Sequence, residues 1–430
     1  MKNSLSVALA SLVLTSSMGH ALPLYLSDAY EKALANNHGY RSKLLEKESS
    51  LYGQKQREAK LYPQVQLALN GGLHDYVQNY DEQKNVSEIY KSYSLSLTQP
   101  LYRPEIVESI DQGVLRKEGA EAETHKSSQE LGIEVSKAYF ELLFARKSLE
   151  LAQANFDYYT IKYKMISEML SHGLSNKMDL LDTQFYMDKS LIEINTAKKK
   201  ERLSHRKLED LLLSPISELP SFFPYDDVET SKTALQTDLS LSPDLKIAAL
   251  SRQIAQKELS IRKYDHYPKV DLSLSRTENE TNDAAMYKID NRAYVQVTIP
   301  IYQGGATEAK VEEARLLHLS QIQKEAQTKQ KFDFQLEELF EEQNVITQNI
   351  GILKNASTAS KLNITAIETA QKSGLKSQTD LLEARSKLYK IEQDLLRQQI
   401  DFVINSLNIL SLQGNIETET LKSFEKQFLR

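Results

Sequence analysis

The sequence predicts a mainly α-helical chain with a β portion, built from a unit of two β-strands and long coiled-coil helices that occurs twice. Three observations predict this fold class. A Gly-Leu motif at Gly173 returns at Gly374, 201 residues later, with its leucines and its aspartate in register. Heptad patterns of apolar residues flank both motifs. Segments that alternate apolar and polar residues precede the long helical stretches.

The duplication extends over most of the chain. Residues 173–181 read Gly-Leu-Ser-Asn-Lys-Met-Asp-Leu-Leu, and residues 374–382 read Gly-Leu-Lys-Ser-Gln-Thr-Asp-Leu-Leu. Two further motifs recur at nearly the same spacing: Tyr62-Pro63 matches Tyr267-Pro268, and Pro100-Leu101-Tyr102 matches Pro300-Ile301-Tyr302. A period near 200 residues indicates a duplicated domain and not a short solenoid repeat. We expect a first repeat over residues 22–213 and a second repeat over residues 241–413.

The N-terminus has the layout of a secretory signal peptide, expected over residues 1–21. Lys2 precedes an apolar run from Leu5 to Leu14, and small residues lead to a cleavage point after Ala21. An apolar run this short does not span a bilayer, and no other window approaches the length of a membrane helix. The chain contains no cysteine, which excludes disulfides, thiolate metal sites and lipid attachment at a processed N-terminal cysteine. We therefore expect an exported protein without a helical anchor.

Composition narrows the possible partners. The 53 Lys and Arg residues are outnumbered by 59 Asp and Glu residues and form no long basic run, so nucleic acid is not an expected partner. The eight histidines lack metal-ligand spacing, and no serine-nucleophile motif or phosphate loop is present, so we expect neither an enzyme nor a cofactor or metal site. The 22 tyrosines, against no tryptophan, suit either a membrane boundary or a tyrosine-rich core.

The helical segments are long. We expect long helices over residues 104–171 and 303–373, because Pro104 suits a first helical turn and nothing interrupts the first run before His172-Gly173. Each spans about 100 Å at about 1.5 Å per residue. An unbroken heptad seam runs through Leu131, Val135, Ala138, Leu142, Ala145, Leu149, Ala152, Phe156, Tyr159, Tyr163, Ile166 and Leu170.

Shorter helices are expected over residues 38–61, 175–213 and 377–413. Placed end to end, the shorter helices of a repeat would cover nearly the length of its long helix, so each half would form a rod of two helices. Ser, Thr and Gln at many seam positions favour helices that surround a wet interior. A plain coiled-coil rod would show the same periodicity.

Four strands are expected at about 64–71, 92–101, 269–276 and 293–302, as two hairpins with polar loops of about 20 residues. Each alternates an apolar and a polar face, and the last one is expected to place Tyr294 with Val295 and Val297 on its apolar face. A soluble, half-buried sheet shows the same alternation. Export, the hairpin loops and a polar face of Ser, Thr and Gln favour a transmembrane barrel. Four strands cannot close a barrel, whereas three copies would supply twelve.

Taken together, the signal peptide, the Tyr-Pro before a strand, the Pro-Ile-Tyr-Gln-Gly-Gly stretch at 300–305 and the paired Gly-Leu turns resemble the TolC family of outer-membrane efflux and secretion ducts. The resemblance implies a homotrimer with a 12-stranded transmembrane barrel in the outer membrane and a periplasmic α-helical tunnel. It implies a passive exit duct of a tripartite efflux or type I secretion system. The partners would be a periplasmic adaptor, an inner-membrane pump and outer-membrane lipid. Residues 214–240 and the tail 414–430 would form an equatorial belt.

The same resemblance assigns roles to residues near the two turns. Asp380 and Glu383 would form an acidic ring at the tunnel entrance, where the family usually has two aspartates. The simpler alternative is that acids in a first helical turn only complement the helix dipole. Asp179, Asp182, Lys376 and Gln371 would latch the entrance shut, chiefly through a link from Asp179 to Lys376. An exposed pair of this kind is worth only about 0 to 1 kcal/mol.

The turn tips Gly173, Leu174, Gly374 and Leu375 would meet the hairpin of the adaptor. Two other functions remain open from the residues alone. One is a soluble periplasmic coiled-coil scaffold or binding protein, in which the four strands form a small sheet. The other is an adaptor of the same pump systems, although an adaptor would need a single hairpin, and the hairpin here is duplicated.

Overall fold

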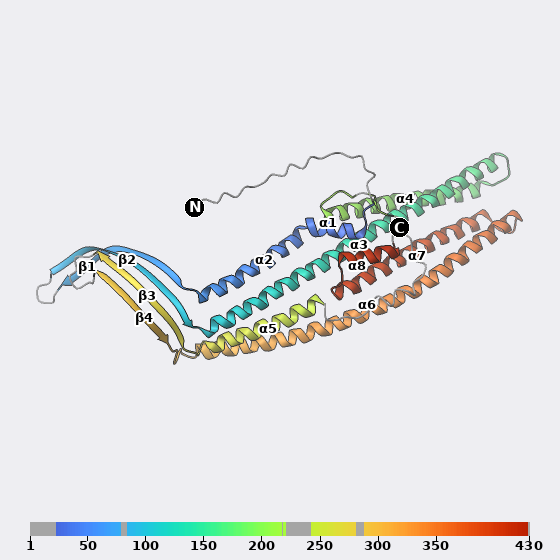
Figure 1. Ribbon diagram of the computed structural model, residues 1–430. Coiled ribbons are helices and arrows are strands. Elements are labelled where there is room, and N and C mark those ends of the chain that lie inside the picture. Colours follow the sequence, from blue (N-terminus) through green and yellow to red (C-terminus); the bar gives the residue numbers. More distant parts are fainter. Residues whose placement is uncertain (1–22, 79–83, 217, 221–241, 281–287, 429–430) are drawn as a thin grey trace.

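The computed structural model describes residues 23–78, 84–216, 218–220, 242–280 and 288–428. A curved four-stranded sheet stands at one end of an elongated molecule, and two long helical rods run away from it side by side (Figure 1). The expected signal peptide and most of the expected segment 214–240 lie outside the described residues.

Helices account for most of the described chain, which confirms the mainly α-helical fold class. They are α1 (Leu26–Asn36), α2 (His38–Glu58), α3 (Pro104–Ser171), α4 (Lys177–Leu212), α5 (Pro243–Tyr264), α6 (Ala306–Lys372), α7 (Gln378–Leu412) and α8 (Thr418–Phe428), with a short 3-10 turn at Ala59–Leu61. Helix α6 begins three residues later than expected, because Gly304 and Gly305 adopt positive φ angles of 63° and 81°. Among the described helices, none is both long and apolar enough to cross a bilayer.

Each long helix is accompanied by shorter helices placed end to end. Helix α2 packs on one half of α3 and α4 on the other, while α5 and α7 divide α6 in the same way (Figure 1). Helix α3 also contacts α5 and α7, and so joins the two repeats along its length. The expected heptad seam of α3 faces these neighbours, and Val135, Ala138, Leu142, Ala145 and Ala152 are buried.

The sheet is antiparallel throughout, with strand order β1-β2-β3-β4. The strands are β1 (Gln64–Gln78), β2 (Lys84–Tyr102), β3 (Lys269–Glu280) and β4 (Ile289–Thr298). The first two come from the first repeat and the last two from the second, and the β2–β3 ladder joins the repeats. Strands β1 and β4 are the edges.

Two strand expectations were wrong. Neither hairpin has a loop of about 20 residues. The β1–β2 ladder continues from Gly71↔Lys91 to Gln78↔Lys84, and β3 extends to Glu280 while β4 begins at Ile289. Main-chain pairing extends the strands beyond the stretches in which the sequence alternates clearly. Strand β4 ends at Thr298 and not at residue 302, since Pro300 has no N–H to donate to a ladder.

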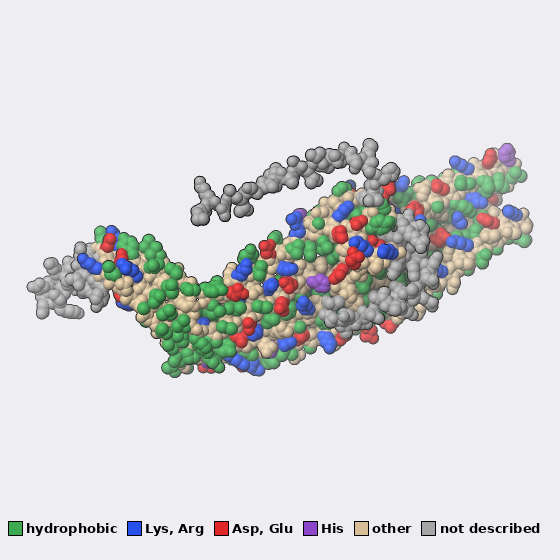
Figure 2. Space-filling view, in the orientation of Figure 1, with side chains coloured by type: hydrophobic (Ala, Val, Ile, Leu, Met, Phe, Trp, Pro, Cys, Tyr) green, Lys and Arg blue, Asp and Glu red, His purple; other side chains and the backbone are tan. Residues whose placement is uncertain are grey.

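One face of the sheet is apolar and exposed. It carries Val65, Leu67 and Leu69 of β1, Leu95 of β2, Leu274 of β3, and Val295 and Val297 of β4, which are 39–66% exposed. Figure 2 shows hydrophobic side chains gathered on the part of the sheet next to the helices, with charged ones toward its far end. Two ion pairs lie there, Lys91 with Glu280 and Arg276 with Glu278. Tyr294 was expected on the apolar face, but it lies opposite Ser273 on the polar face.

The described tyrosines include both exposed and buried side chains. Four surround the junction of strands and helices and are 47–82% exposed: Tyr62, Tyr102, Tyr267 and Tyr302. Three others, Tyr30, Tyr139 and Tyr159, are buried between helices.

The main hydrophobic core lies at the middle of the rods, where α1 and the C-terminal helix α8 meet α3, α4 and α7. The Tyr139 hydroxyl donates to the Leu24 carbonyl at 2.8 Å. The Glu425 carboxylate on α8, 8% exposed, accepts hydrogen bonds from the N–H and the hydroxyl of Ser27 in the first turn of α1. It thus satisfies an otherwise unpaired donor at a helix N-terminus and ties the two ends of the described chain together.

Burial gives Glu425 a measurable pH signature. Burial raises the pKa of Glu425, although the hydrogen bonds from Ser27 oppose that shift. A raised carboxyl pKa means that the contribution of this group to stability is complete below its unfolded pKa of 4.5 and is lost as pH rises through the folded pKa. We therefore expect the difference in Tm between wild type and Glu425→Gln to shift in favour of the variant as pH rises from about 4 to 7.

Thermal unfolding followed by circular dichroism measures this difference. Glu419→Gln is the matched control, because Glu419 lies on the same helix with its side chain 83% exposed and paired only with Lys422. Parallel curves of Tm against pH for wild type and Glu425→Gln would contradict the prediction.

Candidate functional site at the helical tips

The two helical hairpins end in the same turn, at the end of the molecule opposite the sheet (Figure 1). Gly173 and Gly374 each have φ 73°, a left-handed conformation that glycine adopts without strain. The N–H of Gly173 donates to Leu170 O, and that of Leu174 to Met169 O; Gly374 and Leu375 donate to Gln371 O and Ala370 O in the same way. These bonds form the Schellman motif that closes a helix C-terminus.

The leucine after each glycine is left unpacked. In a Schellman motif the residue at this position frequently packs on the last turn of the helix. Here Leu174 is 72% exposed and Leu375 is 79% exposed. Each tip therefore presents one apolar side chain to the surroundings.

Asp380 has two roles at the start of α7. Its carboxylate accepts from the N–H of Ser377 at 2.9 Å and from the Ser377 hydroxyl at 2.8 Å, while Ser377 Oγ accepts from the Asp380 N–H at 3.1 Å. This reciprocal arrangement is a capping box. These hydrogen bonds, followed by that from Lys376, hold the pKa of Asp380 below its ordinary value. Asp380 is therefore a fixed negative charge at neutral pH.

A second acidic side chain lies one turn further along. Glu383 is exposed and follows Asp380 by three residues, so both lie on one side of α7. Burial, and then the negative charges of Glu383 and Asp182, raise the pKa of Tyr186 on α4. Acidic side chains from both repeats therefore lie close enough to act on the same tyrosine, Tyr186.

The contacts of the expected latch residues differ from the expected ones. Lys376 Nζ lies 3.2 Å from Asp380 Oδ1 of its own repeat, and the described residues contain no ion pair between Lys376 and Asp179. Asp179 accepts from the Ser175 hydroxyl at 3.3 Å. Lys376 pairs with Asp380 because the two residues are only four positions apart around the start of α7, whereas Asp179 belongs to the other repeat.

The link between repeats at the tips is made by other atoms. Asp182 Oδ2 on α4 accepts from the Thr379 hydroxyl on α7 at 2.8 Å. Gln371 donates to Gln378 Oε1 at 2.5 Å, within the second repeat. Thr379 was not among the residues predicted from the sequence. Its signal was the departure from the repeat, since the equivalent first-repeat residue, Met178, has no hydroxyl.

An aromatic cluster behind the tips ties the first hairpin to α7. The rings of Tyr159 on α3 and Tyr186 on α4 stack at 5.7 Å, and the Tyr159 hydroxyl donates to Leu382 O on α7 at 3.2 Å. The Arg385 guanidinium lies 4.8 Å from the centre of the Tyr158 ring. Burial raises the pKa of Glu193, which faces this cluster from α4.

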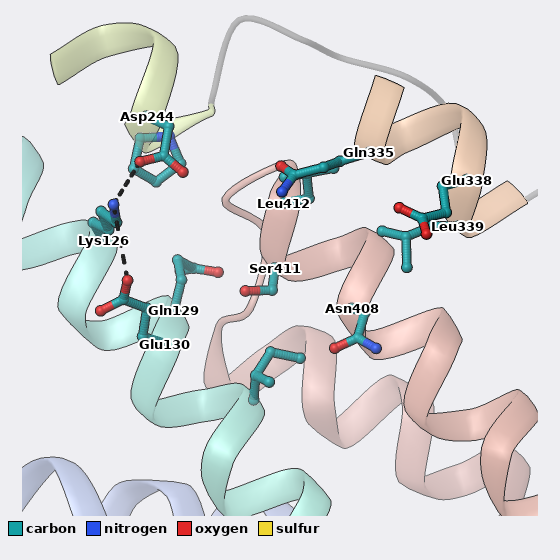
Figure 3. Close-up of a pocket in the computed structure, with 12 residues that line it drawn as sticks. Lys126, Gln129, Glu130, Asp244, Gln335, Glu338, Leu339, Asn408, Ser411 and Leu412 are labelled. Atoms are coloured by element: carbon teal, nitrogen blue, oxygen red, sulfur yellow. Dashed lines mark ion pairs between the residues drawn. The ribbon is translucent and has the colours of Figure 1, made fainter. Parts of the chain in front are cut away.

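A pocket of about 420 Å³ marks the place where α5 begins and α7 ends (Figure 3). Helices α3 and α6 complete its walls. Lys126 pairs with Asp244 at 2.7 Å and lies 3.9 Å from Glu130, while Asn408 and Ser411 come from α7 (Figure 3). The pocket is the gap between two helices placed end to end, and three of its charged side chains, Lys126, Glu130 and Asp244, are paired with one another.

Comparison with known proteins agrees with this arrangement of two matched repeats. The sequence model described as outer membrane efflux protein matches residues 29–212 and 234–415, which correspond to the two repeats. The chain belongs to the outer membrane efflux protein family. This confirms the resemblance drawn from the turn and strand motifs, and it places the protein in the outer membrane.

Individual relatives are distant in sequence but match over nearly the full chain. The alkaline protease secretion protein AprF of Pseudomonas aeruginosa is 23% identical over 95% of this chain and 88% of its own length. The outer membrane protein TolC of Escherichia coli is 22% identical over 92% and 83%. The structure of the outer membrane protein VceC from Vibrio cholerae has a TM-score of 0.78 at 15% identity, covering 91% of this chain and 97% of that one. This efflux-family chain therefore shares their fold.

The hydrogen bond between Thr379 and Asp182 gives a first test of the site. A hydrogen bond to a charged group contributes about 1.5 to 3 kcal/mol. We expect Thr379→Val to loosen the contact between the two tips and to speed tryptic cleavage after Lys177 and Lys376. Limited proteolysis of the purified protein, with fragments identified by mass spectrometry, measures this.

Thr369→Val is the matched control, because the Thr369 hydroxyl bonds only to Thr365 O of its own helix at 2.9 Å. Equal cleavage rates at both lysines in Thr379→Val and in the control would show that the bond does not hold the tips together.

Proposed function

We propose that three copies of this chain form a passive outer-membrane exit duct of a tripartite efflux or type I secretion system. A periplasmic adaptor and an inner-membrane pump complete the system, and the pump supplies the energy. The observation that carries this proposal is that one chain has two open edges, both in its sheet and in its helical part.

In the sheet, the open edges are β1 and β4. Unpaired N–H and C=O groups along an edge strand are a template for a further strand, and inside a bilayer each unsatisfied group costs several kcal/mol. The exposed apolar face of the same strands needs an apolar environment. A barrel needs about eight strands or more, so the four strands of one chain require further copies, and three copies supply twelve.

In the helical part too, each repeat forms one of the two open edges. Near the sheet the helices pack in the order α2, α3, α5, α6, and near the tips in the order α4, α3, α7, α6. The first repeat therefore always supplies one edge and the second repeat the other. Contacts between unlike edges are heterologous, and such contacts generate closed rings when the rotation per copy allows it. Supporting this, AprF of Pseudomonas aeruginosa is named a secretion protein.

The acidic residues of α7 fit the narrow end of such a duct. In a trimer, Asp380 and Glu383 would contribute six carboxylates around one axis, and rings of acidic side chains attract cations in other pores. The lowered pKa of Asp380 keeps its charge in place at neutral pH. Asp380 also caps its helix, so the ring function and the simpler capping role are combined in one residue.

The exposed leucines suit contact with the adaptor. We assign Leu174 and Leu375, on the turns made by Gly173 and Gly374, to that contact. For the latch we retain Asp179, Asp182, Lys376 and Gln371 as the polar groups that hold the entrance shut. The bond from Thr379 to Asp182 supports the role of Asp182. The link from Asp179 to Lys376 would require Lys376 to leave Asp380.

The second candidate, a soluble periplasmic scaffold, is disfavoured by the exposed apolar face of the sheet. Four assays of the mature protein separate the two functions: outer-membrane fractionation, native mass in detergent, vesicle leakage and planar-bilayer conductance. The duct predicts a trimer in the outer membrane that conducts ions. A monomer that is soluble without detergent and leaves vesicles intact would rule the duct out.

The acidic ring generates a specific prediction. We expect Asp380→Ala combined with Glu383→Ala to raise single-channel conductance and to lower cation preference, because the shorter side chains widen the mouth and the loss of negative charge removes the attraction for cations. Planar-bilayer recordings measure both quantities.

Ser377→Ala is the control, since it removes the cap, worth about 0.5 to 2 kcal/mol, without changing charge. The control should keep wild-type cation preference. If the double variant shows wild-type conductance and selectivity, Asp380 is only a capping residue.

A further inference from the structure

We infer that neighbouring copies are held in register by a charged seam, in which a cationic face of α4 on one copy meets an acidic face of α6 on the next. This inference rests on the trimer proposed above and names the surfaces that would form it. The occupant of each face is a second copy of this chain.

The cationic face lies on the part of α4 nearest the molecular middle. Lys199, Leu203 and Arg206 are spaced i, i+4 and i+7, so they lie on one side of the helix, with Lys207 beside them. All four are exposed, and Leu203 is 57% exposed. The opposite side of α4 carries the buried Ile194 and Leu208, which pack toward α3. The cationic face therefore points away from its own chain.

The acidic face lies on α6. Phe334, Glu337, Glu341 and Val345 are spaced i, i+3, i+7 and i+11, which again places them on one side. All four are exposed, Phe334 at 65% and Val345 at 52%. The buried residues Phe332, Gln343 and Ile346 define the other side, which faces α7. This face also points away from its own chain.

Neither face is neutralised within one chain. In the described part of the molecule, Lys199, Arg206, Glu337 and Glu341 form no ion pair, whereas the adjacent Lys200 and Glu201 pair with Glu141 and Arg146 of α3. Like charges four residues apart on a helix, as at Glu337 and Glu341, destabilise the helix. An oppositely charged neighbour would remove that repulsion on α6.

The two faces lie at similar heights along the rods. Lys200 of α4 and Arg397 of α7 both pair with Glu141 of α3, which places them on one level. The Asn405 side chain of α7 donates to Leu339 O and to Gln343 Oε1 of α6. Arg397 and Asn405 are eight residues apart, or about 12 Å along the helix. Long Lys, Arg and Glu side chains on slightly tilted helices can bridge much of this difference in height between the two faces.

Apolar residues continue both faces toward the tips. On α4 these are Ile192, Phe185 and Leu181, and on α6 they are Ile352 and Leu362, all 54–68% exposed. The edges therefore match in order, with charge near the middle and apolar residues toward the tips. Complementary charge sets register and orientation, and it suppresses the wrong pairing of two like edges. Two α4 edges or two α6 edges would repel one another, which favours a head-to-tail ring.

Charge reversal tests the seam. One variant carries Lys199→Glu and Arg206→Glu, a second carries Glu337→Lys and Glu341→Lys, and a third combines all four changes. Trimer and monomer fractions of the full-length protein are measured in detergent by native mass spectrometry, at low and high salt. We expect each two-site variant to weaken trimerisation at low salt by about tenfold or more, and the combined variant to recover most of it. High salt should shrink these differences.

The matched control exchanges a self-contained pair elsewhere. Lys147 and Glu150 on α3 lie 2.6 Å apart, and Lys147→Glu with Glu150→Lys should leave the trimer as in wild type. If both two-site variants form wild-type trimers at low salt, the seam is wrong while the duct stands. If wild type itself is monomeric, the proposed function fails first. If the variants lower the Tm of the monomer and the combination does not recover, the residues act within their own chain and the inference is overturned.

Discussion

Unpaired main-chain groups at the edges of the sheet constrain everything else in this chain. Strands β1 and β4 each leave a row of N–H and C=O groups without partners, and the apolar face beside them is unsuited to water. A single copy cannot satisfy either requirement by rearranging itself, because its four strands are joined in one fixed order. The helical rods also have two open edges, because the repeat that supplies an edge strand also supplies an edge helix. The assembly of copies proposed above would satisfy the open edges of the sheet and of the rods together.

At the tips, a small number of residues each have more than one role. Ser377 and Asp380 close the start of α7, and the same carboxylate is the fixed charge of the proposed ring. The glycines that terminate α3 and α6 also leave the following leucines exposed. The same turn therefore closes the helix and exposes the leucine of the proposed partner contact. The tip can present charge and an apolar side chain without extra structure.

The two repeats have diverged where they face one another. Thr379 bonds to Asp182, while Met178, its counterpart, cannot form the reciprocal bond. Duplication supplied a common scaffold, and a substitution at a contacting position then distinguished its two halves.

The duplication, the lengths of the long helices, the turn positions and the family were all predicted correctly from the residues alone. These depend on periodicity and capping among residues a few positions apart, where local geometry suffices. The three-dimensional structure was needed to show how far β1 and β2 extend, which face Tyr294 occupies and that Asp182 pairs with Thr379. The first two outcomes depend on main-chain pairing between neighbouring strands, which the alternation of side chains does not reveal. The third depends on how two helical hairpins about 200 residues apart in the chain are set against one another, because a polar side chain at the tips has several partners within reach.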